Sequence, residues 1–125
     1  MQLRRFTTFS GTSRAKMSLG FVLVEYMSTI PIRINGDSMW PTFRDGDIIE
    51  CQTYVGQIVN IGDIIVFPRP NLSNSILVKR VISINNDQCI VEGDNPDPNA
   101  STDSHNFGPI NISSIIAIRH TDNPV

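Results

Sequence analysis

Apolar residues after Ile30 fall in short runs separated by turn-forming residues. The runs are rich in β-branched side chains and bounded by Gly, Asp, Asn or Pro, which is typical of strands. We therefore expect strands at Ile32–Ile34, Asp47–Gln52, Ile58–Ile61, Ile64–Phe67, Leu77–Ile84, Cys89–Glu92 and Ile112–Arg119. No segment in this part of the sequence has sustained helical periodicity. The pattern predicts an all-β fold, a compact and mostly antiparallel domain of seven short strands.

Turn signals separate the expected strands. Gly62-Asp63 and the polar segment Pro68–Ser75 divide the central runs. Asn85–Asp87, between two β-branched runs, is a hairpin signal. The expected domain spans residues 31–120, with a short tail at residues 121–125.

The first part of the chain, residues 1–30, consists of a basic arm followed by a short apolar segment. Its first 17 residues contain only basic charges, at Arg4, Arg5, Arg14 and Lys16. The apolar run Ser18–Val24 is shorter than the ~20 residues that cross a bilayer as a helix. The arm resembles a targeting peptide in outline. It is expected to be a short helix or strand covering the core; the alternatives are a weak peripheral membrane contact or translation from Met17.

Composition narrows the function classes. The chain has 125 residues, of which 40% are hydrophobic and 18% charged, so one globular domain is expected. The net charge of −2 gives no basic field for nucleic acid. Cys51 and Cys89 lie in apolar runs and are expected to be buried free thiols, with a disulfide as the alternative. A zinc site has little support, because His105 and His120 are far apart and no C-x-x-C occurs.

The sequence N-G-D-S-M-W-P-T places a single serine, Ser38, in a turn. Ser38 is either an ordinary turn residue or a nucleophile, and a nucleophile needs a base. Neither His105 nor His120 has an obvious orienting acid nearby in the sequence. The better candidate is Lys79, in the run Ile76–Ile82.

Lys79 has apolar neighbours on the face that it would share in a strand. Side chains alternate between faces, so Lys79 lies with Leu77 and Val81, while Arg80 lies on the other face with Ile76, Val78 and Ile82. Both faces are apolar, so one of the two cations is expected to lie against a hydrophobic surface. Burial lowers the pKa of a lysine, and a neutral amine can take the proton of a serine hydroxyl. Arginine stays charged and cannot. The alternative is a lysine that snorkels from an edge strand.

A polar loop, Val91–Ile110, is long enough to be functional. One interpretation is calcium binding, because Asp97, Asn99, Ser101 and Asp103 alternate as at the start of an EF-hand loop. Thr102 and Gly108 stand where that loop needs Gly and Glu. The other interpretations are a solvated loop and a shell of hydrogen bonds that orients the lysine.

Four segments in order resemble the type I signal peptidase family of serine proteases. They are G-D-S-M-W-P-T, G-D-I-I-V-F, L-V-K-R-V-I and G-D-N followed by S-x-D-S and F-G-P, within Ile34–Ile118. The resemblance implies an all-β catalytic core. It implies that Ser38 is the nucleophile, Lys79 the general base, Ser101 the serine that hydrogen-bonds the lysine, and Asp103 the acid that steadies the loop. Met39 and Pro41 match residues that shape the nucleophile turn.

Three positions depart from the family pattern. The loop has two extra residues between Asn95 and Ser101. His105 stands where the family usually has arginine, which weakens an ion pair once the imidazole is neutral. Gly36 stands where some members have a serine that helps bind the oxyanion.

Typical signal peptidases carry membrane anchors and often a second β domain, which we do not find in this sequence. That resembles a short, soluble branch, the nickel-type superoxide dismutase maturation proteases. The resemblance implies a cytoplasmic enzyme without cofactor or metal, which binds a precursor as an extended peptide and frees its N-terminus. The alternative is a minimal signal peptidase or inner-membrane-protease-like enzyme that contacts the membrane through residues 17–30.

Two other classes fit the sequence less well. Self-cleaving repressors share the Ser-Lys chemistry but need a site such as Ala-Gly in the same chain, and this sequence has no Ala-Gly. An inactive β-module would have no reason to keep both Ser38 and Lys79.

Overall fold

The structure, a computed structural model, describes residues 28–121. The predicted N-terminal arm lies outside these residues except for its last three positions, and residues 122–125 of the predicted tail lie outside them too. Strand β1 begins at Thr29, so it crosses the expected domain boundary at residues 30 and 31. Among residues 28–121, no helix combines the length and apolar character needed to cross a bilayer.

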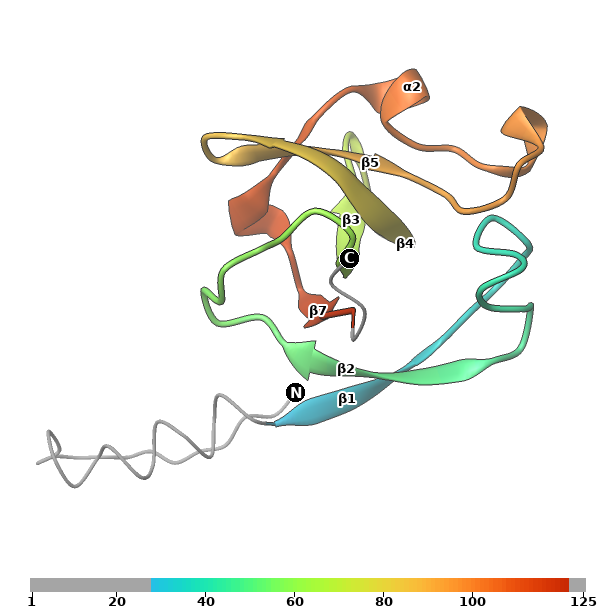
Figure 1. Ribbon diagram of the computed structural model, residues 1–125, viewed down its shortest axis with the longest axis horizontal. Helices are drawn as coiled ribbons and strands as arrows, with labels where there is room; N and C mark the ends of the chain where they lie inside the picture. The colour runs from blue at the N-terminus through green and yellow to red at the C-terminus, as the bar shows by residue number, and fades with distance from the viewer. Residues whose placement is uncertain (1–27, 122–125) are drawn as a thin grey trace, which may run out of the picture.

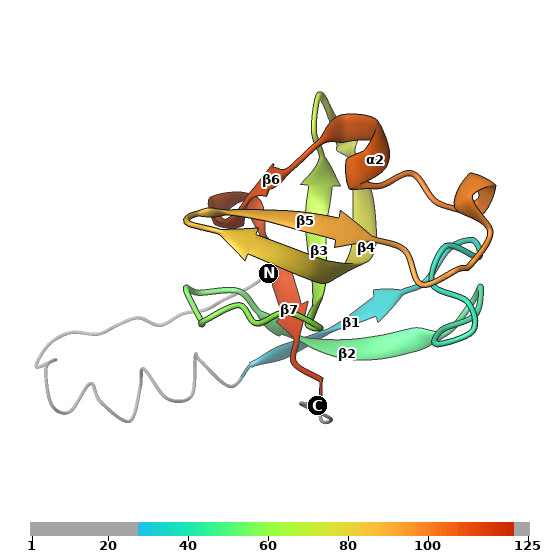
Figure 2. The ribbon, with the colours of Figure 1, turned by 45° about the horizontal axis from the view of Figure 1, so that its top comes forward.

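Seven strands form one antiparallel sheet, which confirms the all-β prediction (Figure 1). The strand order is β1-β2-β7-β3-β4-β5-β6. In Figure 1 and in Figure 2, β1 and β2 lie below, β5 lies above, and β7 lies between them. The strands are β1 (Thr29–Arg33), β2 (Ile48–Thr53), β3 (Ile64–Arg69), β4 (Leu72–Asn85), β5 (Gln88–Glu92), β6 (Ile110–Asn111) and β7 (Ala117–Arg119).

Strand β3 is buried on both faces and joins two apolar clusters. Ile65 and Phe67 belong to one cluster, and Ile64 and Val66 belong to the other. Since side chains alternate along a strand, one continuous apolar run supplies both clusters. The site described below lies where β4, the neighbour of β3, approaches the end of β1.

The predicted hairpin at Asn85–Asp87 is confirmed. Asn85 pairs with Gln88, and Asn86 adopts a positive φ of 61°. Asparagine tolerates this conformation better than most residues, which suits a tight turn between strands.

The polar segment Pro68–Ser75, expected as a separator, is largely strand. Arg69 pairs with Leu72, so the chain reverses at Asn71 (φ 65°) and β4 begins five residues before the expected Leu77. The missed part, Leu72–Ser75, is mostly exposed. A strand without a buried face shows no apolar alternation, which is why the sequence pattern missed it.

Of two other strand predictions, one was wrong and one was right only in its last three residues. Ile58–Ile61 is a loop in which the two isoleucines are 78% and 66% exposed. The buried Gln57 side chain fixes this loop by accepting the N–H of Val55 (2.7 Å) and donating to the carbonyl of Thr53 (2.9 Å). The expected strand Ile112–Arg119 is confirmed only at Ala117–Arg119 (β7), and its first part is a short 3-10 helix, η2 (Ile112–Ser114).

The helix η2 has a local cause. The Asn111 side chain accepts the N–H of Ser113 (3.1 Å), which caps the turn and competes with continued strand pairing.

Both cysteines are buried free thiols, as predicted, and they lie in different apolar clusters. Burial raises the pKa of Cys51 and of Cys89 to about 11. Such thiols are protonated at neutral pH and are therefore poor nucleophiles.

Candidate active site

Ser38 lies in a hydrogen-bonded turn that follows β1. The N–H of Ile34 donates to the carbonyl of Asp47 (2.8 Å), and the N–H of Gly36 donates to the Asp45 carboxylate (2.7 Å). Gly36 has a φ of +87°, a conformation that favours glycine. This backbone holds Ser38 half-buried in the turn after the edge strand β1.

Met39 and Pro41, the predicted turn-shaping residues, lie on either side of Trp40. The Met39 side chain is buried in the cluster that also contains Ile34 and Val66, so it anchors the turn to the core. Pro41 is exposed and joined to Trp40 by a cis peptide bond.

Lys79 is buried on β4, with only 3% of its surface exposed. Burial lowers the pKa of the Lys79 ammonium, and the negative charge of Asp103 acts in the opposite direction. The lysine therefore does not snorkel to solvent.

Arg80, next in the chain, has a different environment. Its guanidinium forms a bidentate pair with the Asp94 carboxylate, at 2.8 and 2.7 Å. The hydrogen bond to Asp94 raises the pKa of Arg80. The two neighbouring basic residues thus have different environments, since Lys79 is buried and Arg80 is paired with a carboxylate.

Ser38 and Lys79 line the same small cavity, of about 80 Å³. It lies between the end of β1 with its following turn and the Ile76–Lys79 part of β4. Its other lining residues are Arg33, Ile34, Asn35, Met39, Ile76, Leu77 and Val78. A residue with a hydroxyl and a buried lysine therefore line one cavity, which is the pairing that a Ser-Lys reaction requires.

The loop after β5 packs directly on the backbone of Ser38. The N–H of Asn95 donates to the Ser38 carbonyl (2.9 Å), and the Asn95 side chain donates to the carbonyl of Asp37 (2.8 Å). A Cβ added to Gly93 would lie 2.5 Å from the Ser38 carbonyl oxygen and 2.5 Å from Ser101 Oγ. Only glycine fits between these two atoms.

Ser101 and Asp103 are brought together beside this glycine. The Asp103 carboxylate accepts hydrogen bonds from Ser101 Oγ (3.1 Å), the Gly93 N–H (3.2 Å) and the His105 N–H (3.0 Å). Burial raises the pKa of Asp103, but these donors and the His105 ring outweigh it and leave that pKa lowered. The predicted hydrogen bond from Ser101 to Lys79 stays a prediction.

His105 has an acid partner, contrary to expectation. Its Nδ1 lies 2.9 Å from Asp103, and its Nε2 lies 3.6 Å from Glu92. The Asp103 hydrogen bond, with the charges of both acids, raises the pKa of the exposed His105. His105 lies in α2 (Ser104–Phe107), a four-residue helix whose N-terminus is capped by the Asp103 side chain. Sequence reasoning missed this helix, although D-S-H-N resembles a capping box.

Thr42 and Asp94 were missed as site residues. Thr42 Oγ1 donates to Asp94 (2.6 Å), the carboxylate that also pairs with Arg80. Asp94 therefore links the turn that contains Ser38 to β4. Two sequence features pointed to Asp94: it belongs to the G-D-N motif, and the cation Arg80 stands beside Lys79. The Thr42–Asp94 contact could not be predicted in this way, because it joins residues 52 positions apart.

In the loop considered for calcium binding, the carboxylates of Asp97 and Asp103 already accept hydrogen bonds from the chain. The Asp97 side chain accepts the N–H of Asn99 and caps η1 (Pro98–Ala100), and Asp103 is engaged as above. In the part of the chain that the structure describes, no three His, Cys, Asp or Glu side chains are grouped to hold a metal ion.

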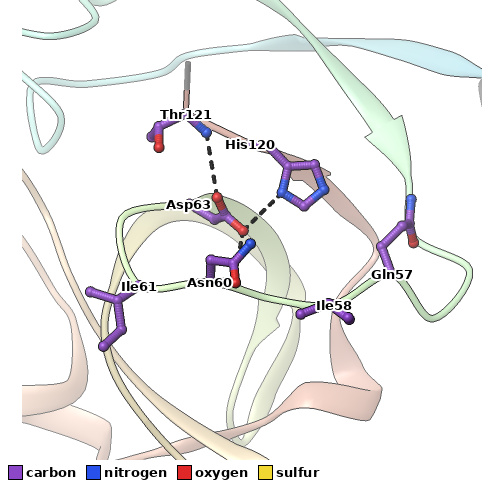
Figure 3. Close-up of a pocket in the computed structure, with 7 residues that line it drawn as sticks. All are labelled: Gln57, Ile58, Asn60, Ile61, Asp63, His120 and Thr121. Atoms are coloured by element: carbon purple, nitrogen blue, oxygen red, sulfur yellow. Dashed lines mark hydrogen bonds and ion pairs between the residues drawn. The ribbon is translucent and has the colours of Figure 1, made fainter. Parts of the chain in front are cut away.

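A larger cavity, of about 540 Å³, holds the other histidine (Figure 3). His120 Nδ1 lies 2.9 Å from the buried carboxylate of Asp63, so this histidine also has an orienting acid. Figure 3 shows the pair with Asn60 and Thr121. Ser38 does not line this cavity.

One family model, described as "Signal peptidase, peptidase S26", matches residues 13–95, about two thirds of the 125 residues. The matched span contains Ser38 and Lys79 and ends before Ser101 and Asp103. No curated protein matches the sequence.

Replacing Asp94 with asparagine should destabilise the fold by about 2–3 kcal/mol at neutral pH, because the Arg80 guanidinium loses a charged partner. Burial raises the pKa of Asp94, but hydrogen bonds from Arg80 and Thr42 outweigh it and leave that pKa lowered. The ion pair thus contributes stability above the unfolded-state pKa of about 4, and this contribution is lost as pH falls through the folded-state pKa. Urea unfolding at several pH values measures both effects.

The matched control is Asp87→Asn, at an exposed hairpin position. Asp94→Asn should lose less stability on acidification than the unmodified chain loses. Asp87→Asn should lose as much stability as the unmodified chain. Identical acid dependence in all three proteins would contradict a stabilising role for the Asp94 pair.

Proposed function

This chain belongs to the signal peptidase family, peptidase S26, and from that premise we propose that it is a serine endopeptidase with Ser38 as nucleophile and Lys79 as general base. Membership makes it a peptidase of the kind that removes leader sequences, and its substrate is a peptide. The observation that carries the proposal is the cavity that Ser38 shares with a buried lysine of lowered pKa.

Burial gives Lys79 the property that a base needs. A lysine ammonium has an ordinary pKa of about 10.4 and cannot accept a proton at neutral pH. Removing it from water disfavours the charged form. The neutral amine takes the proton of Ser38 as the hydroxyl oxygen attacks the scissile carbonyl.

Asp103 limits how far the Lys79 pKa falls. Its negative charge raises that pKa against the effect of burial. Because Ser101, Gly93 and His105 all donate to Asp103, the carboxylate is held in place and stays ionised. In this proposal Ser101 orients the lysine and Asp103 steadies Ser101.

The reaction proceeds in two stages. The tetrahedral oxyanion is stabilised by the backbone N–H of Ser38, and protonated Lys79 then donates its proton to the leaving amine. Water, activated by the same amine, hydrolyses the acyl-enzyme ester. These steps use only groups of the chain and one water.

The substrate binds as an extended strand. In residues 28–121, β1 is an outer strand of the sheet, and residues Ile76–Val78 of β4 pair only with β3. A peptide can add to such a free edge through backbone hydrogen bonds. The cavity of about 80 Å³ beside Ser38 then accepts a small side chain just before the scissile bond.

For the substrate itself, we carry over the resemblance to the nickel-type superoxide dismutase maturation proteases. The proposed substrate is the leader of a dismutase precursor in the cytoplasm. The nickel ion belongs to the dismutase and takes no part in the cleavage. The signal peptidase alternative keeps the same chemistry and cleaves signal peptides at a membrane.

Ser38→Ala and Lys79→Ala should each reduce cleavage by at least about a thousandfold, as expected for members of one catalytic unit. Lys79→Arg should be equally inactive, because arginine retains its proton. The double variant should be no worse than either single variant. Cleavage of a leader peptide, followed by mass spectrometry, measures all four.

Circular dichroism must show that each variant remains folded. Arg69→Ala, at the end of β3 and outside the lining of the cavity that contains Ser38 and Lys79, serves as a control and should leave the rate near that of the unmodified chain. A folded Lys79→Ala enzyme with near-normal turnover would rule out the lysine as base.

Co-expression with a nickel-type dismutase precursor should yield the mature dismutase N-terminus, and Ser38→Ala should leave the leader attached. Intact-protein mass spectrometry distinguishes the two products. An enzyme that leaves this leader intact but trims a signal peptide in lipid vesicles would favour the signal peptidase alternative.

A further inference from the structure

Arg33 stands at the point where a bound peptide has to lie. It is the last residue of β1, it pairs with Ile48 on one side, and in residues 28–121 no strand covers the other side of β1. Arg33 also lines the small cavity that contains Ser38 and Lys79. Apart from Lys79, it is the only charged residue in that lining.

The Arg33 side chain is exposed and held by one hydrogen bond. Its Nε donates to the Asn35 side chain (3.2 Å), another residue of the cavity lining. The ion pairs found within residues 28–121 involve Arg80, His105 and His120. The terminal nitrogens of Arg33 thus remain available to an external carboxylate in this part of the chain.

The acidic residues of the adjacent turn are engaged elsewhere. Asp45 accepts the N–H of Gly36, and Asp47 accepts the N–H of Arg44. Asp37 is exposed but does not line the cavity.

Strand geometry assigns a substrate position to this charge. Along β1, Thr29, Pro31 and Arg33 are exposed, while Ile30 and Ile32 are partly buried, so Arg33 projects from the solvent face. A peptide added to β1 alternates in the same way. If the residue before the scissile bond enters the cavity, the residue one position earlier projects from the solvent face, beside Arg33.

We propose that Arg33 selects leaders with an acidic side chain at the second residue before the scissile bond. This inference rests on the proposed function and narrows its substrate class. Because the pair is solvent-exposed, the preference of kcat/KM for Glu over Gln should be about two- to five-fold at low salt. It should shrink as ionic strength rises.

The test uses three fluorogenic peptides with alanine before the scissile bond and Glu, Gln or Lys one residue earlier. The unmodified chain should cleave them in the order Glu, Gln, Lys. Arg33→Gln should remove the preference, and Arg33→Glu should reverse it. The control Arg44→Gln, which removes an equal charge from an exposed residue outside the cavity lining, should keep it.

Equal rates for the three peptides, with cleavage that depends on Ser38, would overturn the selectivity and leave the endopeptidase proposal intact. The same holds if Arg44→Gln abolishes the preference as fully as Arg33→Gln, since the effect would then be general electrostatics. No Ser38-dependent cleavage of any peptide would overturn the endopeptidase proposal and this inference with it.

Discussion

The burial of Lys79 is the constraint on which the proposed chemistry depends. Removing an ammonium group from water costs free energy. Loss of the proton avoids this cost, so burial lowers the pKa of the lysine. The register of β4 imposes the burial, because Val81, two residues along the same face, is fully buried in the core. A shift by one residue would exchange Lys79 with Arg80, which cannot become neutral.

The polar residues around the site hold three chain segments in one arrangement. Asp94 joins the turn that contains Ser38 to β4 through Thr42 and Arg80, and Gly93 allows the loop after β5 to touch Ser38. These contacts bring the hydroxyl and the amine to one cavity although neither bonds directly to Asp94. Because the site is already arranged in this way, substrate binding energy is not needed to order it.

The sequence predicted what depends on local pattern. The buried strand β3 and the Asn85–Asp87 hairpin follow from alternation and turn chemistry. Alternation also placed Lys79 and Arg80 on opposite faces of β4, but both faces carry apolar residues, so it did not say which of the two is buried. The exposed start of β4 was missed because it has no buried face. The Thr42–Asp94 and His120–Asp63 contacts were missed because they join residues more than 50 positions apart, and local spacing says nothing about such pairs.

The titration of Lys79 itself tests the central claim most directly. Lys16 and Lys79 are the only lysines of the chain, so selective lysine labelling gives two side-chain NMR signals, and Lys16→Arg assigns them. We predict that the Lys79 signal titrates clearly below the ordinary lysine pKa of about 10.4, because burial disfavours its ammonium form. Titration of Lys79 at or above that value would contradict the account.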